Sequence, residues 1–469
     1  MKSKKPEEQN NKKYLVASLY YVIGNVIGQG CVLLSSIIFT RIMSKDAYGL
    51  VNTYAAWVLV LNTFIGLNLF ITVRNAYLDY KEDYEAFQSS VLLLSLLSGV
   101  FFTGVIVGGV RILGIHTEIS VILIAAIQAM SLHTINFQMA VWSMENRYKL
   151  RTMLLVAPNI FHTVMSVVLI FIFPQHQYFA KICGNSFGMA VFAIGIIFYT
   201  FHNASCKGAA RFWKYAVLIS VPAIMSTLSD LLLMQSDRIM LTHMVGASET
   251  AVYSLVYNIG SILIALYTAI NGSWTPWFYK KLDEEKIDEI HRVQKMYVYV
   301  FTYMAIGLLT ISPEVVKVLS PKTYWTGIGY VNLIVIASFL RYLYAFFTTY
   351  LMYLKKTGTI AVNTMIAAIL NIILNYFLIP RYKAYGAAYA TIISYAVLFI
   401  LQYMAMNKQG RAVFDLKSIG MGITIIVVYG GLFYCIKENW IIRYGIVAIM
   451  LVIAFVVFLE YKKGRWKEE

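Results

Sequence analysis

The sequence predicts an all-α protein that crosses a membrane about fourteen times. Three observations lead to this fold class. Of its 469 residues, 59% are hydrophobic and only 13% are charged, whereas soluble domains average roughly 25% charged residues. The mean hydropathy is +0.67. Apolar runs of about 20 residues, long enough to cross a hydrocarbon core of about 30 Å, follow one another along the whole chain.

The apolar runs give the positions of the spans. We expect a polar tail at 1–13 and no cleaved signal peptide, because the first run is longer than a signal-peptide core and shows no small-residue cleavage site. The largest polar connection, at 278–295, is predicted to be an amphipathic helix at the membrane surface. The expected spans are 14–40, 50–73, 88–112, 119–143, 152–173, 178–202, 214–236, 250–275, 296–312, 327–354, 359–379, 384–406, 418–436 and 441–460.

The distribution of lysine and arginine predicts the orientation. If both termini are cytoplasmic, 27 of the 39 basic residues fall in the cytoplasmic segments. Short cytoplasmic loops of membrane proteins are enriched in lysine and arginine, so we expect the N and C termini in the cytoplasm. Topology and contact with anionic lipids then explain the net charge of +16. Nucleic acid is not an expected partner.

Several chemistries lack their sequence signatures. The four cysteines form no CxxC pair and the seven histidines form neither HxxxH nor HExxH, so we expect no disulfide framework and no metal site. No loop is long enough for a nucleotide-binding domain, and no GxxxxGK[ST] motif occurs. No catalytic motif such as Gly-x-Ser-x-Gly appears either. We expect a protein without cofactors that is not an enzyme.

The triplet Arg-Ile-Met occurs twice, in "FTRIMSKDAYG" (39–49) and in "QSDRIMLTH" (235–243). Each copy closes a long apolar run, and a glycine follows the arginine after eight residues. A helix with tyrosine and β-branched residues comes next in both places. Transporters are often built from internal repeats, with the substrate site between the halves. Because six spans separate the two copies, the sequence predicts two parallel halves of six helices each.

Five stretches carry a family resemblance: "SDRIMLTHMVGASETAVYSLVY" (236–257), "SWTPWFYKKL" (273–282), "SPEVVKVLSPKTYWTG" (312–327), "LKKTGTIAVNT" (354–364) and "NIILNYFLIPRYKAYGAAYATIISY" (371–395). In order and spacing they resemble the polysaccharide and oligosaccharide-lipid flippases (Wzx-like). These belong to the superfamily that also holds the multidrug and toxin extrusion transporters and the lipid II flippases. The resemblance covers nearly the whole chain and is strongest in 230–400. One departure is Ala251, where the family often has a glycine.

The resemblance implies a fold of two pseudo-symmetric six-helix lobes around a central cavity. Helices 13 and 14 lie outside the lobes. The expected parts are a cytoplasmic tail at 1–13, an N-lobe at 14–203, a C-lobe at 204–406, and helices 13 and 14 with a cytoplasmic tail at 407–469.

The resemblance also implies a flippase of the cell membrane. Such a protein moves a lipid-pyrophosphate-linked oligosaccharide from the cytoplasmic to the outer leaflet by alternating access, for a capsule, an exopolysaccharide or an O-antigen. The implied partners are membrane lipids, this substrate, and a polysaccharide polymerase and glycosyltransferases that act on the same glycan. Carrying the substrate through lipid requires cations for the pyrophosphate, and amides and aromatic side chains for the sugars.

Arg341, in "ASFLRYLYAFF", is the first candidate for binding the pyrophosphate. If its helix begins near 327, the arginine lies about 21 Å along it, close to the membrane midplane, because a helix rises about 1.5 Å per residue. A charge at that depth costs about 2.5–3.5 kcal/mol. The side chain is therefore expected to face either a substrate cavity or an ion-pair partner on another helix.

Three further arginines are candidates for binding the substrate. Arg41 and Arg238 close two predicted spans at their outer ends, where they either snorkel to the lipid headgroups or belong to an outer gate. Arg74 follows the second span at its inner end. It either anchors that end or meets a headgroup that enters from the cytoplasm.

Two carboxylates and many amides lie in or near the spans. Asp230 is expected about 24 Å along its helix, and Asp237, seven residues later, lies on the same face. Such a carboxylate either pairs with an arginine or binds a proton or cation for coupling. Asn25 and Gln29 of the first helix are candidates for hydrogen bonds to sugars, and interhelix hydrogen bonds of about 0.6 kcal/mol are the alternative.

Two other functions fit parts of the sequence. A multidrug or cation antiporter of the same superfamily needs acidic residues in its spans, but Asp230 and Asp237 stand here against Arg341 and the arginines at the span ends. An intramembrane polymerase or glycosyltransferase usually carries a long external loop with charged residues, and the loops of this chain are short. The balance of charges favours an anionic substrate.

Overall fold

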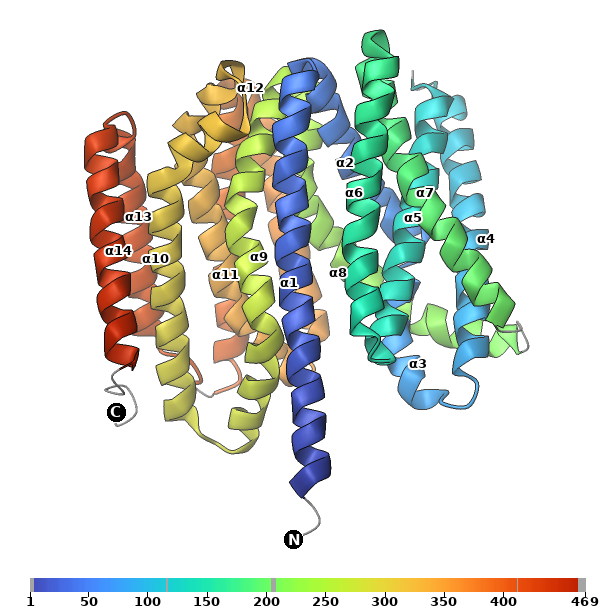
Figure 1. Ribbon diagram of the computed structural model, residues 1–469, viewed down its shortest axis with the longest axis horizontal. Coiled ribbons are helices and arrows are strands. Elements are labelled where there is room, and N and C mark those ends of the chain that lie inside the picture. The colour runs from blue at the N-terminus through green and yellow to red at the C-terminus, as the bar shows by residue number, and fades with distance from the viewer. Residues whose placement is uncertain (1–3, 115–116, 204–207, 411, 463–469) are drawn as a thin grey trace. The chain divides into compact units, whose positions relative to one another are not determined.

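The computed structural model describes residues 4–114, 117–203, 208–410 and 412–462, so 1–3 and 463–469 of the two expected tails lie outside the described residues. Within these ranges every regular element is a helix, as predicted (Figure 1). The short 3-10 helices are η1 (Leu69–Thr72), η2 (Pro174–His176) and η3 (Lys322–Gly329). The α-helices are α1 (Lys4–Ile42), α2 (Lys45–Ile65), α3 (Val73–Asp79), α4 (Tyr84–Ile112), α5 (Ile119–Met144), α6 (Tyr148–Ile172), α7 (Gln177–Asn203), α8 (Ala209–Met244), α9 (Ala247–Asp283), α10 (Ile287–Leu319), α11 (Val331–Tyr353), α12 (Thr357–Asn407), α13 (Leu416–Ile436) and α14 (Trp440–Lys462).

Twelve helices in the described ranges are long and apolar enough to cross a membrane. One of them, α12, holds two predicted spans, because its backbone leaves the helical region at Lys383 (φ 51°, ψ −130°), shortly after Pro380. Proline lacks an amide proton and crowds the preceding turn, so a helix breaks readily near it. A shorter apolar stretch, Trp440–Val456, lies in α14. The prediction of a multi-pass, all-α membrane protein with about fourteen spans is confirmed.

The second span ends earlier than the sequence predicts. It was expected to reach residue 73, but α2 ends at Ile65, and the amide of Gly66 donates back to the carbonyl of Asn62. The next two residues, Leu67 and Asn68, have left-handed backbone angles (φ 47° and 53°), which a continuous helix does not allow. Arg74 therefore lies on the separate short helix α3 and not at the end of a span.

The seventh span ends later than the sequence predicts. The expected end at 236 precedes two charged residues, yet α8 continues to Met244. Asp237 is accommodated within this helix, where it is buried and accepts a hydrogen bond from Tyr253. Arg238 therefore lies within a helix and not just beyond its end.

The polar segment at 278–295 is not a surface helix, which corrects another prediction. α9 runs to Asp283 and α10 begins at Ile287, so the charged residues lie on the ends of two long helices. The turn between them is held by ion pairs, in which Lys281 and Lys286 each contact both Glu284 and Glu289. The mixture of charged and apolar residues that suggested one amphipathic helix belongs to the ends of two helices and the turn between them.

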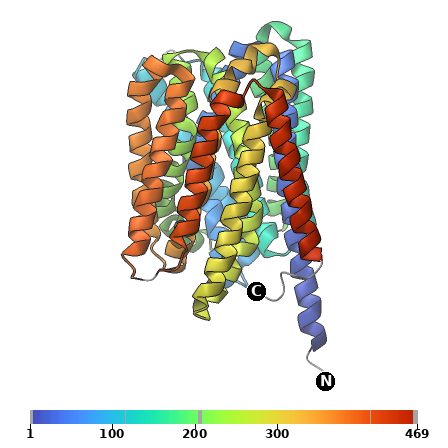
Figure 2. The same ribbon diagram turned by 90° about the vertical axis from the view of Figure 1, so that its left-hand side faces the viewer.

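The helices form two compact units. Unit 1 comprises Met1–Ser254 and Thr357–Lys383, and unit 2 comprises Leu255–Lys356 and Ala384–Glu469. In unit 1, α5 packs against α2, α4, α6 and α7, and α8 packs against α2 and α4. In unit 2, α10 packs against α11, α13 and α14, and Figure 2 shows α10 beside both α13 and α14. The lobe boundaries expected from the sequence stay a prediction.

The two Arg-Ile-Met stretches form the same local structure, a helix, a two-residue turn and a second helix. The turns are 43–44, between α1 and α2, and 245–246, between α8 and α9. The two arginines do not occupy equivalent positions. Arg41 lies in the last turn of α1, whereas Arg238 lies six residues before the end of α8. The shared triplet therefore marks two similar helical hairpins. Aligning the two triplets does not align equivalent positions in the two hairpins.

The two glycines that follow the triplets also differ. Gly246 lies in the turn itself, with φ 133°, a backbone conformation that favours glycine. Gly49 lies inside α2, where a Cβ atom would be 1.7 Å from the carbonyl oxygen of Ala247. Its missing side chain therefore lets the start of α2 touch the start of α9 within unit 1.

Candidate functional site

Arg341 lies about halfway along α11, which begins at Val331 and ends at Tyr353. Residues 322–329 form η3 instead of the first turns of this helix, so the arginine is about 15 Å, not 21 Å, from the helix start. α11 is the most enclosed of the twelve candidate spans, because 61% of the residues in its most apolar stretch are buried. Arg341 itself is half-buried. In a core of about 30 Å, this position is near the midplane.

The surroundings of Arg341 within unit 2 are aromatic. The guanidinium interacts electrostatically with Tyr267 of α9 and Tyr395 of α12. Tyr344, one turn further along α11, stacks on Tyr395 with ring centroids 6.1 Å apart. Aromatic rings attract a guanidinium through their quadrupole. Arg341 therefore lies in a part of unit 2 that is rich in aromatic side chains.

Asp237 belongs to a buried polar network in unit 1. Its side chain is 1% exposed. The hydroxyl of Tyr253 donates to Oδ2 at 2.6 Å, and Nδ2 of Asn375 donates to Oδ1 at 2.7 Å. The same Nδ2 also donates to Oδ1 of Asn371 at 3.0 Å, and that oxygen accepts from the hydroxyl of Ser236 at 2.7 Å. Asp237 thus links α8 to the first part of α12, and its coupling role stays a prediction.

Asp230 and Arg238 have different surroundings from Asp237, although all three lie on α8. Asp230 is exposed, whereas Arg238 is half-buried. Nη1 of Arg238 donates to Oε1 of Gln235 at 2.6 Å. Asp230 and Asp237 are seven residues apart along one face, yet only Asp237 enters the core of unit 1.

The remaining predicted site residues are dispersed. Arg41 is exposed, and its Nη1 donates to the carbonyl of Ile37 at 2.9 Å. Asn25 and Gln29 are half-buried on the same helix, but their positions are about 24 and 18 Å from that of Arg41 along its axis. Arg74 is exposed on α3. The structure does not bring Arg41 together with the two amides of α1.

A hollow of about 520 Å³ lies between α2 and α8 within unit 1. Its lining holds no Asp, Glu, Lys or Arg, so it offers no charged group to a phosphate. Among the described residues, no group of three or more His, Cys, Asp or Glu is arranged to hold a metal ion. The hollow is lined by Thr53, Trp57, Ile239, Met240, Thr242, His243 and Met244.

Lys181 is a buried lysine that the sequence interpretation missed. Its side chain lies on α7, is 4% exposed, and donates from Nζ to Oδ1 of Asn185 at 2.9 Å. Nζ also lies 3.5 Å from the ring centroid of Phe39, and the hydroxyl of Ser166 donates to the same Asn185 oxygen at 3.2 Å. A lysine four residues before an asparagine in a predicted span was the available signal, since i and i+4 share a helix face.

The Lys181 contact yields a stability prediction. Asn185→Leu is expected to lower the free energy of unfolding by about 1–3 kcal/mol, because it leaves the buried Lys181 donor without its acceptor. The measurement is denaturant unfolding of the purified protein in detergent. In a Lys181→Met background the same Asn185→Leu change is expected to cost much less, since the lysine donor is gone. An equal cost in both backgrounds would contradict this account of the pair.

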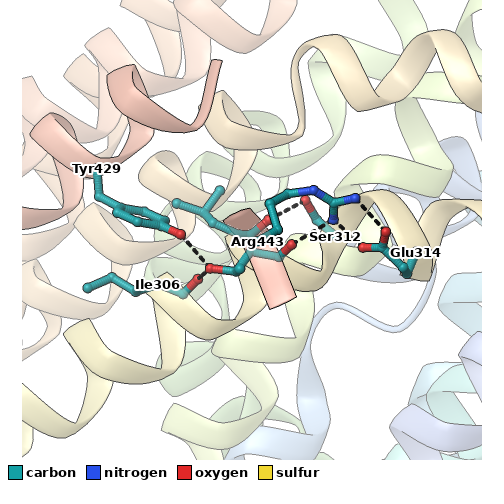
Figure 3. Close-up of polar contacts among 7 residues, drawn as sticks. Ile306, Ser312, Glu314, Tyr429 and Arg443 are labelled. Carbon is teal, nitrogen blue, oxygen red and sulfur yellow. Dashed lines mark hydrogen bonds and ion pairs between the residues drawn. The ribbon is translucent and has the colours of Figure 1, made fainter. Parts of the chain in front are cut away.

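A second buried basic residue outside the predicted site is Arg443 of α14. Figure 3 shows its guanidinium facing Glu314 of α10. Nη1 and Nη2 contact the two carboxylate oxygens, the second at 2.5 Å, and Nη1 also donates to the carbonyl of Thr310 at 3.0 Å. The hydroxyls of Thr310 and Tyr429 lie 2.5 Å apart. The network ties α10, α13 and α14 together inside unit 2.

Comparison with known proteins adds a family and a named relative. A family model described as "Polysaccharide biosynthesis protein" matches residues 16–282, more than half of the chain. The "Probable flippase AglR" of Haloferax volcanii is 26% identical over 197 residues, which cover 39% of this chain and 40% of that protein. The chain thus spans about two fifths of the length of this curated relative.

Solved structures share the fold. A structure described as "Lipid II flippase MurJ, inward closed conformation" matches with a TM-score of 0.71 and 13% identity, over 95% of this chain and 99% of that one. An outward-facing multidrug resistance MATE family transporter of the MOP superfamily matches with a TM-score of 0.59 and 13% identity, over 85% and 96%. These findings confirm the resemblance noted in the sequence. With a family match over more than half of its length, this chain belongs to the polysaccharide biosynthesis protein family.

Proposed function

We propose that this protein is a flippase that moves a lipid-diphosphate-linked oligosaccharide from the cytoplasmic to the outer leaflet of the cell membrane. It works by alternating access and leaves the substrate chemically unchanged. The glycan feeds a surface polysaccharide such as a capsule, an exopolysaccharide or an O-antigen, together with a polymerase and glycosyltransferases. Both termini lie in the cytoplasm, in line with the 27 of 39 basic residues on that side of the expected topology.

The position of Arg341 is the observation that carries this proposal. A diphosphate is an anion that loses its water when it enters a low-dielectric core, so its passage needs a cation at membrane depth. Arg341 is half-buried midway along the most enclosed candidate span. A planar guanidinium binds phosphate oxygens through two parallel N–H donors. The flippase name of the relative and the shared MurJ fold support the same activity.

Removing the guanidinium is expected to reduce flipping. Arg341→Ala should lower the rate roughly 10- to 100-fold, because a hydrogen bond to a charged group contributes about 1.5–3 kcal/mol. The assay reconstitutes the protein in liposomes with a polyprenyl-diphosphate oligosaccharide and follows exposure of the glycan to a lectin added outside. Arg341→Lys keeps the charge and should recover part of the rate, and Arg111→Ala, at an exposed arginine of α4, is the control. Flipping by Arg341→Ala at the normal rate would refute the assigned role.

A multidrug or cation antiporter is the second candidate. Asp230 favours it, because this carboxylate is exposed on a candidate span, where a cationic drug needs an acidic partner. The MATE likeness concerns the fold alone. If cells expressing the protein gained drug resistance that Asp230→Asn abolished, while glycan flipping stayed absent, the antiporter would replace the flippase.

A further inference from the structure

Three tyrosines of unit 2 lie beside Arg341. Tyr344 and Arg341 are three residues apart on α11, which puts them on one face with about 5–6 Å between their Cβ atoms. Tyr395 of α12 stacks on Tyr344, with an angle of 26° between the rings. Tyr267 of α9 lies near both Tyr344 and Arg341. One cation and several flat aromatic faces therefore share one region of unit 2.

The stacked pair combines a buried ring with a half-buried one. Tyr395 is 2% exposed, whereas Tyr344 is half-buried. Tyr395 therefore supports Tyr344 from the core side, and Tyr344 keeps part of its surface available. An aromatic side chain with only two rotatable bonds loses little conformational entropy when it contacts a ligand. Tyr344 thus has the properties of a rigid contact surface next to a cation.

The chemistry of this surface fits a sugar. A pyranose has a face of C–H groups that packs against an aromatic ring, and its hydroxyls lie at the ring edge. Tyrosine matches both parts, since its apolar face ends in a hydroxyl that donates and accepts hydrogen bonds. A diphosphate needs a cation instead. Arg341 and Tyr344 place these two chemistries one helical turn apart.

We propose that Tyr344, supported by Tyr395, binds the first sugar of the glycan, the one joined directly to the diphosphate. This inference rests on the proposed function, in which Arg341 holds the diphosphate. The first sugar is bonded to the terminal phosphate, so its ring must lie close to the cation that holds that phosphate. Tyr344 is close to Arg341, about 5–6 Å away at Cβ. Sugars further along the glycan extend beyond this ring.

The test compares two lipids that differ only in the sugar. The probes are a polyprenyl diphosphate and the same lipid carrying one glucose, and binding is measured by titration of the purified protein in lipid nanodiscs. Tyr344→Ala is expected to weaken binding of the glucosyl lipid about five- to tenfold, in the range of aromatic contacts, and to leave the sugar-free lipid unchanged. Tyr344→Phe keeps the ring face and should retain most of the binding. Arg341→Ala should weaken both lipids.

Controls separate the subsite from the proposed function. Tyr342 lies on α11 between Arg341 and Tyr344, is 2% exposed, and stacks on Phe301 with ring centroids 3.9 Å apart. Because this ring is buried against the core, the Tyr342→Phe protein should bind both lipids normally. Normal binding of the sugar-free lipid also shows that Tyr344→Ala is folded. Equal weakening of both lipids, or no weakening of either, would overturn the subsite alone. If the unmodified protein binds neither lipid, the proposed function and the subsite both fail.

Discussion

Replacing Glu314 with leucine is expected to destabilise unit 2 by about 3–5 kcal/mol, the usual cost of leaving one partner of a buried ion pair without its counterion. The Arg443 side chain is 2% exposed and that of Glu314 is 27% exposed. After the substitution the guanidinium keeps the carbonyl of Thr310 as an acceptor, but it loses both carboxylate oxygens. Denaturant unfolding of the purified protein in detergent measures the loss.

Two further variants show whether the cost comes from the orphaned charge. The double variant Glu314→Leu/Arg443→Met removes both charges and is expected to recover most of the lost stability, since apolar replacements of a buried pair are often neutral. Glu438→Leu, at an exposed carboxylate of the same unit, should stay within about 0.5 kcal/mol of the unmodified protein. A double variant no more stable than Glu314→Leu would argue against the ion pair as the cause.

Replacing Asp237 with leucine is expected to destabilise unit 1 by about 2–6 kcal/mol. The carboxylate accepts from Tyr253 and from Asn375. The leucine takes this acceptor away from the Tyr253 hydroxyl, and it leaves Nδ2 of Asn375 with Oδ1 of Asn371 for only one of its two hydrogens. An unsatisfied buried donor costs about 1–3 kcal/mol. Tyr253→Phe removes only one of the two hydrogen bonds, so it should cost less than half as much. The same unfolding measurement in detergent compares the two variants.

Asp237→Asn distinguishes a structural role from a role in ion coupling. The amide keeps one oxygen acceptor and nearly the same volume, so stability should fall by less than with leucine. If Asp237 is only structural, glycan flipping should follow stability across the variants. A stable Asp237→Asn protein that no longer responds to an ion gradient would assign coupling to this carboxylate. Equal stability of the leucine variant and the unmodified protein would contradict the hydrogen-bond network.

The spans were predictable because the requirement that defines them is local. A segment crosses lipid when about 20 consecutive residues are apolar, whatever the rest of the chain does. For the same reason the sequence located Arg341 within a span. Its distance from the helix start changed from about 21 to 15 Å, because the preceding residues adopt the tighter η3 helix.

Helix ends and burial were less predictable because they depend on distant residues. Charges at 237 and 238 appeared to end a span, but Asn375, 138 residues later, supplies the hydrogen bond that lets Asp237 stay inside. The burial of Arg443 depends on Glu314, 129 residues earlier in the chain. Lys181 shows the same dependence, since its Nζ contacts the ring of Phe39 on α1.

The sequence was sufficient to predict the fold class, the number of spans and the family. Composition, the length of the apolar runs and the family motifs predict them, and each of these is a property of consecutive residues. The surroundings of the polar side chains required the folded units. The helical spacing predicts that Tyr344 lies beside Arg341, but only packing brings Tyr267 of α9 and Tyr395 of α12 to the same region. A charged side chain within the membrane needs a polar partner or a water-filled cavity. Packing between helices that are far apart in the chain selects that partner.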